Sequence, residues 1–346
     1  MDIQLGLDTF GDVTVGPDGA LLPHAQVVRD VLEQGRLADA VGVDAFGVGE
    51  HHRDDYAVSA PDIVLAGLAT TTERILLGSA VTVLSSDDPV RVLERFATID
   101  ALSGGRAEVT LGRGSFTESF PLFGFDLADY EVLFSEKLDL FARLRAAAAE
   151  GRPLSWEGST RRPLVDAQVW PRPAEPLRSW VAVGGSPESV VRAARYGLPL
   201  MLAIIGGEPA RFAPYVDLYR RALDELGQPG LPVGVHSPGF VAPTDAEARD
   251  RLFPHFKANR DRIGRERGWP PATRDQLDAE ADHGALFVGS PETVAQKIAG
   301  TVRTLGIDRF DLKYSHGPLP HEHLMECIGL YGTEVAPRVR ELLATG

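Results

Sequence analysis

Three adjacent titratable residues, Glu50, His51 and His52, follow the short apolar segment 43–49. An apolar run of this length is typical of a buried strand in a parallel sheet. The carboxyl ends of such strands face the ligand crevice. An imidazole beside a carboxylate can hold or move a proton there. We therefore expect Glu50, His51 and His52 to be catalytic; the alternative is that one histidine caps the next helix and the other is solvated.

A second candidate site is the segment 183–189, which combines a glycine turn with a helix start. Gly184 and Gly185 leave backbone amides uncovered, Ser186 stands at the N-cap, and Pro187 lies in the first turn. Free amides, hydroxyl groups and the helix dipole together make an anion site, which phosphate usually occupies. The alternative is a plain tight turn capped by Ser186.

Arg113 lies between Gly112 and Gly114, which allow a backbone or a ligand to come close. Arginine binds phosphate bidentately, so we expect Arg113 to complete a phosphate site with the 183–189 turn. The alternative is a salt bridge to a loop carboxylate such as Glu118.

The sequence predicts no metal site. Adjacent side chains at a strand end point in opposite directions, so His51 and His52 are poorly placed to bind one ion together. His-Glu-x-x-His is absent, and His321-Glu322-His323 reads as a solvated helix start. The single cysteine, Cys327, excludes a cysteine-based zinc site and an intrachain disulfide, and we expect it to be buried. The lack of Gly-x-Ser-x-Gly further disfavours a hydrolase.

Eight strand–helix units are needed to position these residues. Predicted strands lie near residues 3, 44, 75, 107, 180, 200, 233 and 309, and each interval is long enough for a crossover. Eight units in series indicate an α/β fold of the (β/α)8 TIM-barrel type. The alternative, a doubly wound open sheet, would require Gly-x-Gly-x-x-Gly after the first strand. We predict one domain over 1–346, with insertions after strand 4 (about 116–176) and before strand 8 (about 265–285).

The composition excludes several classes of partner. The 346 residues are 44% hydrophobic and carry a formal net charge of −14. This acidic balance argues against a nucleic-acid or anionic-membrane surface. No apolar run reaches the roughly 20 residues that span a bilayer, and no basic region precedes an apolar run at the start. We expect a cytoplasmic protein with no membrane and no nucleic-acid partner.

Motifs spread over nearly the whole chain carry a family resemblance. They are Gly-Glu-His-His at 49–52, Gly-Ser-Ala-Val-Thr-Val-Leu at 78–84, Asp-Pro-Val-Arg at 88–91, Leu-Ser-Gly-Gly-Arg at 102–106, Gly-Arg-Gly at 112–114, Gly-Gly-Ser-Pro-Glu-Ser at 184–189, Gly-Leu-Pro at 197–199 and Val-Gly-Ser-Pro-Glu at 288–292. Each motif is modest, but their shared order is specific. The chain resembles the bacterial luciferase-like family of flavin-dependent monooxygenases, and its less characterised branch more than the light-emitting subunit.

The resemblance implies a barrel that holds FMN, usually reduced, at its carboxyl mouth. The segment Ser79, Ala80, Val81 would lie against the isoalloxazine ring, with a cis peptide bond between Ala80 and Val81. His51 or His52 would lie near the reactive ring edge, where a neutral imidazole can stabilise or protonate the product of flavin and oxygen. The residues that would hold the phosphate are Arg113, Gly184, Gly185, Ser186 and Ser189.

The activity implied is that of a flavin-dependent oxidoreductase, a monooxygenase acting on paired donors with incorporation of molecular oxygen into a small organic substrate. A separate NAD(P)H:flavin reductase would supply reduced FMN, and the helices at 62–71 and 90–102 would form a homodimer. The alternatives are a deazaflavin-dependent dehydrogenase on the same barrel and a non-catalytic flavin-binding protein. Two departures put light emission in doubt: Gly112 replaces a cysteine of the light-emitting subunit, and 202–205 lacks its tryptophans. We expect the loops 116–125, 152–176 and 268–283 to select the substrate.

Overall fold

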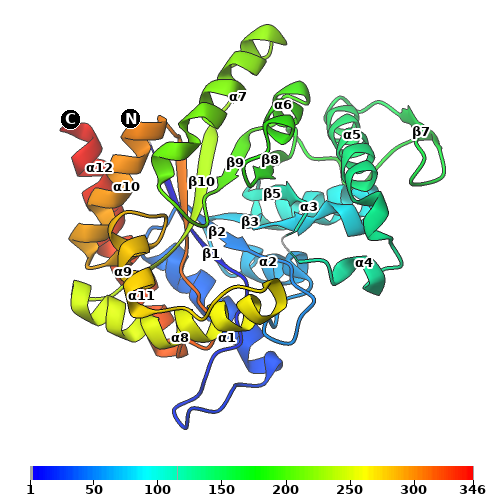
Figure 1. Ribbon diagram of the computed structural model, residues 1–346. Coiled ribbons are helices and arrows are strands. Elements are labelled where there is room, and N and C mark those ends of the chain that lie inside the picture. The colour runs from blue at the N-terminus through cyan, green and yellow to red at the C-terminus, as the bar shows by residue number, and fades with distance from the viewer. Residues whose placement is uncertain (1–2, 115, 346) are drawn as a thin grey trace.

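Eight parallel strands form a closed barrel in the computed structural model, which describes residues 3–114 and 116–345 (Figure 1). The first strand pairs with both the second and the last, which closes the ring. In order around the barrel the strands are β1 (Gln4–Thr9), β2 (Ala45–Val48), β3 (Leu76–Ser79), β5 (Ala107–Gly112), β8 (Arg178–Val183), β9 (Leu200–Ala203), β10 (Val233–Val241) and β12 (Arg309–Lys313). The predicted (β/α)8 fold and all eight predicted strands are confirmed.

An outer layer of helices covers the barrel. The helices that follow the strands are α1 (His24–Ala40), α2 (Pro61–Ala69), α3 (Pro89–Ser103), α5 (Tyr130–Ala149), α6 (Pro187–Arg195), α7 (Ala213–Glu225), α10 (Pro291–Leu305), α11 (His321–Leu330) and α12 (Ala336–Ala344). Their ends follow local sequence signals: Asp88 accepts hydrogen bonds from two amides at the start of α3, and Gly104 ends that helix in the left-handed conformation. No described helix has the length and apolar character needed to cross a bilayer.

The two insertions lie after the fourth and before the eighth barrel strand, as predicted. The first contains α4 (Ser119–Leu122), the 3₁₀ turn η2 (Leu127–Asp129) and an antiparallel hairpin of β6 (Leu154–Trp156) and β7 (Leu164–Ala167). The second contains α8 (Asp245–Arg267), α9 (Arg274–Asp282) and β11 (Phe287–Gly289). In Figure 1, α8 runs across the carboxyl end of the barrel. The second insertion therefore begins earlier than the predicted residue 265, because α8 belongs to it and α10 covers the strands here.

Glycines make room for acidic side chains inside the barrel. Three buried carboxylates lie opposite a glycine of the neighbouring strand, in the pairs Gly6 with Asp311, Gly47 with Asp8, and Gly78 with Glu108. A Cβ atom at Gly47 would lie 1.8 Å from Oδ1 of Asp8, and one at Gly6 would lie 2.0 Å from Oδ1 of Asp311. The barrel interior therefore carries charged side chains. Glycine is required at the facing positions because a larger residue would collide with them.

Candidate active site

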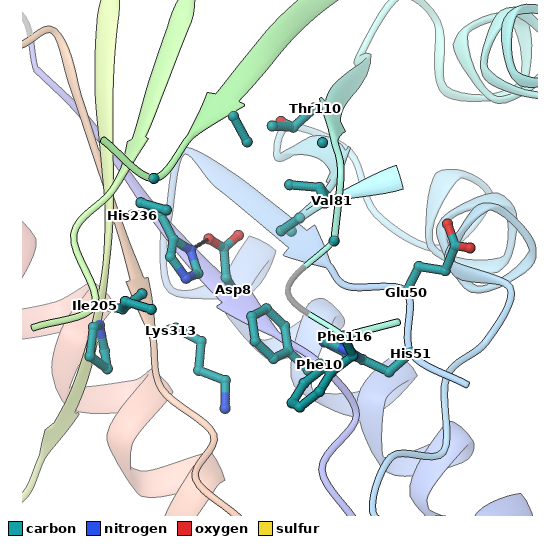
Figure 2. A pocket seen from close by; sticks show the side chains of 18 of the residues that line it. Asp8, Phe10, Glu50, His51, Val81, Thr110, Phe116, Ile205, His236 and Lys313 are labelled. Atoms are coloured by element: carbon teal, nitrogen blue, oxygen red, sulfur yellow. Dashed lines mark hydrogen bonds and ion pairs between the residues drawn. The ribbon is translucent and has the colours of Figure 1, made fainter. Parts of the chain in front are cut away.

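One cavity of about 580 Å³ opens at the carboxyl ends of the strands, and all eight barrel strands contribute to its lining (Figure 2). This volume lies within the range typical of small-molecule and cofactor sites. Helix α8 covers the cavity with apolar and charged side chains, including Phe256, Arg260 and Ile263. Short strands end here in turns, so side chains of residues distant in sequence converge on one space.

His51 lies within an aromatic group on one wall of this cavity. Its ring stacks on Tyr56 at 4.3 Å and lies 4.7 Å from the ring of Phe10, and Figure 2 shows Phe116 beside them. Burial lowers the pKa of His51 to about 3; the positive charges of Lys313 and Arg53 act in the same direction and Asp12 opposes them. His51 is therefore a neutral imidazole at physiological pH, as the sequence interpretation requires.

Glu50 and His52 form a hydrogen-bonded pair beside His51. Oε1 of Glu50 lies 3.0 Å from Nε2 of His52, and Oε2 accepts a hydrogen bond of 2.9 Å from the amide of Val83. One oxygen of Glu50 thus holds His52 within the β2 turn, and the other ties this turn to the segment after β3. All three predicted residues line the cavity; both oxygens of Glu50 are engaged in hydrogen bonds, and His51 is held by ring contacts.

The segment Ser79-Ala80-Val81 forms the facing wall, and the peptide bond between Ala80 and Val81 is cis, as expected. The hydroxyl of Ser79 accepts hydrogen bonds from the Thr110 amide and from Thr82. Ser79 therefore fixes the shape of this wall through β5. A Cβ atom at Gly112 would lie 2.6 Å from Cγ2 of Val81, so glycine is required at 112 because Val81 fills the space.

Of the predicted phosphate residues, Arg113 and Gly184 line the cavity, and Gly185, Ser186 and Ser189 lie beside them at the start of α6. Nη2 of Arg113 lies 3.4 Å from the Ser189 hydroxyl, and Ser186 caps α6 by accepting from the Ser189 amide. Gly184 lines the cavity and has open space around it, while Gly185 has a φ of +114°, a conformation that favours glycine. The structure thus brings these residues together around the start of a helix, where an anion is favoured.

Two charged residues at this end were not predicted. Arg113 pairs with Glu131, and Nη2 of Arg192 lies 3.4 Å from the other oxygen of Glu131. The alternative role expected for Arg113, a salt bridge to a carboxylate, is therefore present, but its partner is Glu131 of α5 and not Glu118, which pairs with Arg53 at 2.5 Å. In the described part of the chain, Nη1 of Arg192 is buried without a hydrogen-bond partner. An unused buried donor beside Arg113 fits a phosphate group at this site.

Asp8 and His236 form a second pair that sequence reasoning missed. Nδ1 of His236 lies 2.6 Å from Oδ2 of Asp8, and Figure 2 shows the two side chains directed toward each other. Both residues line the cavity, and Asp8 is almost fully buried. A carboxylate on one ring nitrogen fixes the tautomer and leaves the other nitrogen for a ligand. Both residues stand at strand ends, and that shared position is the signal that could have connected them.

A buried ionic cluster lies beneath this pair. Arg309 donates to both oxygens of Asp311 at 2.8 and 2.9 Å and to Glu108 at 2.5 Å. Burial raises the pKa of Asp311 to about 7; Asp8 and Glu108 reinforce this increase and Arg309 opposes it. The cluster therefore holds one carboxyl group that can gain or lose a proton near neutral pH.

The loops expected to choose the substrate divide into two kinds. Phe116 and Trp269 line the cavity, so the first and third of these loops contribute to it. No described residue between 152 and 176 lines it, because that segment forms the β6–β7 hairpin. Side chains of α8, and not those of 152–176, cover the cavity. Arg53, directly after His52, binds Glu266 of α8 at 2.7 and 3.0 Å and so holds the helix over the cavity.

Comparison with known proteins gives the class to which this barrel belongs. The family model of luciferase-like monooxygenases matches residues 9–309, and the chain belongs to that family. The 4-hydroxyprotoasukamycin monooxygenase of Streptomyces nodosus subsp. asukaensis is 30% identical over 291 residues, 78% of this chain and 75% of that protein. An uncharacterised protein of Sinorhizobium fredii is 28% identical over 185 residues, and the match spans only 52% of this chain and 51% of that protein.

Solved structures share the fold at low sequence identity. Monooxygenase RslO1 of Streptomyces bottropensis has a TM-score of 0.79 at 23% identity, covering 97% of this chain and 99% of its own. The oxygenating component of 3,6-diketocamphane monooxygenase of Pseudomonas putida, solved with FMN, has a TM-score of 0.74 at 19% identity over 98% and 99% of the two chains. A secondary alcohol dehydrogenase dependent on a deazaflavin coenzyme reaches 0.74 at 18% identity over 98% and 100%.

Proposed function

We propose that this protein is a monooxygenase that uses reduced FMN and O₂ to oxygenate a small organic substrate. The observation that carries this proposal is that one cavity is lined both by Arg113, whose guanidinium lies 3.4 Å from the Ser189 hydroxyl, and by the neutral imidazole of His51. The distance along the cavity is spanned by the Ala80–Val81 segment. Reduced FMN would supply the two electrons that activate O₂.

The residues of the chain have separate tasks in this proposal. Arg113, Ser186, Ser189 and the amides of Gly184 and Gly185 would bind the phosphate. His51 would hold or deliver one proton at the reacting edge, while Phe10 and Tyr56 exclude water around its ring. The Asp8–His236 pair would bind a polar group of the substrate, and the aromatic side chains under α8 would bind its apolar part.

Replacing Arg113 tests the phosphate site. Arg113→Gln removes a charge-assisted pair with phosphate, so we expect the Kd of FMN to rise by about 10- to 100-fold, while that of riboflavin, which lacks phosphate, stays unchanged. Anaerobic titrations with oxidised and reduced FMN measure both values. Equal losses for FMN and riboflavin would refute the assignment of Arg113 to phosphate.

The second candidate is a deazaflavin-dependent dehydrogenase, which the dehydrogenase structure of the same fold and TM-score supports. Oxygen consumption with each reduced cofactor separates the two candidates, because only the monooxygenase activates O₂. A third outcome, tight binding of FMN with no turnover beyond free flavin, would indicate a flavin-binding protein. We also propose that a separate NAD(P)H:flavin reductase supplies the reduced flavin. If so, adding such an enzyme with NADH should sustain oxygenation of the substrate, beyond the oxygen consumption of the reductase with free FMN alone.

The proposal extends to a homodimer formed through α2 and α3. These two helices pack on each other, and Ile63 and Leu102 are 70% and 51% exposed at their surface. Covering such side chains is favourable and gives a reason for a second copy. Light scattering should give the mass of two chains, and a monomer at micromolar concentration would contradict this part of the proposal.

A further inference from the structure

Glu131 places a carboxylate between the two arginines at the phosphate end of the cavity. It is the second residue of α5, and its side chain is 62% exposed. One carboxylate oxygen accepts a hydrogen bond from Nη1 of Arg113, and the other lies 3.4 Å from Nη2 of Arg192. The carboxylate therefore stands where both guanidinium groups converge.

Aromatic rings hold the two guanidinium groups independently of Glu131. The guanidinium of Arg113 lies 5.2 Å from the ring centre of Tyr130 and 5.9 Å from that of Phe134. That of Arg192 lies 5.6 Å from the same Phe134 ring, which is buried. Such contacts are attractive and do not require an anion. The arginine pair is thus prearranged, and moving Glu131 away would leave both charges in place.

One carboxylate does not satisfy this pair. Glu131 is the carboxylate that contacts both guanidinium groups; Glu188 of α6 accepts a hydrogen bond from Ser186 and acts on Arg192 only through its charge. The described structure leaves Nη1 of Arg192 without a hydrogen-bond partner. A phosphate dianion has more acceptor oxygens and balances both charges. It can take the place of Glu131 because that side chain is exposed and can turn into solvent.

We propose that Glu131 is an internal counter-ion that competes with the flavin phosphate for Arg113 and Arg192. Glu131 thereby lowers the affinity of the arginine pair for phosphate, so that free inorganic phosphate binds weakly and a phosphate carried by a flavin still binds. The inference rests on the proposed function. A flavin brings the binding energy of its ring system and can displace Glu131, whereas free phosphate has no such additional contacts.

The test compares Glu131→Gln with the wild type. Glu150→Gln is the matched control, because Glu150 lies at the other end of α5 and pairs with Arg152. The Kd values of oxidised FMN and riboflavin, and competition by inorganic phosphate, are measured by flavin fluorescence at low ionic strength. For Glu131→Gln we expect FMN and inorganic phosphate to bind about two- to five-fold more tightly, with riboflavin unchanged. The gain should shrink at high salt and be absent in the control.

The outcomes separate this inference from the proposed function. If the wild type binds FMN more tightly than riboflavin but Glu131→Gln behaves like the wild type or binds FMN more weakly, Glu131 is not a competitor and only this inference fails. An equal change for FMN and riboflavin would also overturn it, because the effect would not involve phosphate. If the wild type binds neither flavin, both the flavin assignment and this inference fail.

Discussion

At the scale of single residues, two neighbouring histidines have different surroundings. His51 is packed among Phe10, Tyr56 and Phe116 and is neutral, whereas His52 is hydrogen-bonded to Glu50. An imidazole with a pKa of about 3 carries one ring proton over the whole physiological range. It can donate that proton as a hydrogen bond without changing charge. His52 is held as part of the turn, so we assign the chemistry to His51.

Replacing His51 tests this assignment. His51→Ala should lower the rate of the oxygen-dependent step with bound reduced FMN by about 100-fold, the usual cost of removing one hydrogen-bond donor to developing charge. The Kd of FMN should change less than two-fold, because the phosphate site lies at the other end of the cavity. His52→Ala is the control and should have the smaller effect on rate. Loss of FMN binding in His51→Ala would instead show that this ring is structural.

The sequence predicted the site residues that lie at strand ends within recognisable motifs. It did not predict pairs that form only when distant strands are aligned in the closed barrel. Glu50, His51 and Arg113 fall into the first group. The Asp8–His236 pair falls into the second, because 228 residues separate its members and only barrel closure brings them together. The salt-bridge partner of Arg113 was missed for a similar reason. It is Glu131, 18 residues away on α5, and not a carboxylate of the adjacent loop.

At the scale of elements, the glycine positions of the strands determine where charge can enter the barrel. Gly47 of β2 allows the carboxylate of Asp8 to lie against the backbone and reach His236. A larger residue at 47 would have to displace a buried carboxylate from its partner. Strand β2 therefore shapes the site although it supplies no side chain at this position.

Gly47→Ala should reduce the free energy of unfolding by about 3 kcal/mol, because it overpacks the interior and disturbs a buried pair. The double variant Gly47→Ala, Asp8→Ala should recover part of this loss. Chemical denaturation measures both. Gly300→Ala in α10 is the control; no atom lies within 4 Å of the new methyl group, and alanine favours a helix, so stability should not fall. An unchanged free energy of unfolding for Gly47→Ala would show that Asp8 has room to move.

Helix α8 shows why the predicted start of the second insertion, near residue 265, was too late. Its sequence is helical throughout, which the spacing predicted, but only Ala248, Leu252 and Gly264 of its 23 residues are buried. A helix that is polar on nearly all sides does not pack on a barrel. That lack of an apolar face is a signal, present in the sequence, that 245–267 covers the mouth instead.

At the scale of the whole molecule, buried titratable groups link stability to pH. Burial lowers the pKa of His51 and of His316 to about 3, in His316 with a further contribution from Lys313. The unfolded chain binds these protons near pH 6.5, so stability is present above that pH and is lost as the pH falls toward 3. Asp311 acts in the opposite direction, because its raised pKa makes the folded state bind a proton below about pH 7.

His316→Gln should flatten this acid dependence. Each buried histidine contributes at most about 1.4 kcal/mol per pH unit between pH 6.5 and 3, and the variant removes one such contribution. Glutamine can still donate to the Gly239 carbonyl, which lies 3.2 Å from Nε2 of His316. Urea unfolding at a series of pH values gives the slope for both proteins. Parallel slopes would mean that His316 is protonated in the folded state.

The ion pairs of Arg53 connect the turn that carries His51 to both insertions, which affects how substitutions in these segments can accumulate. It is 7% exposed and joins Asp55, Glu118 of the first insertion and Glu266 of α8, while its backbone continues the turn that carries His51. A mutation that removes Glu266 from α8 therefore loosens both the helix over the cavity and the turn next to the imidazole. New substrate ranges should arise in this lineage through paired inherited changes, so that the residue types at 53 and 266 covary among descendants.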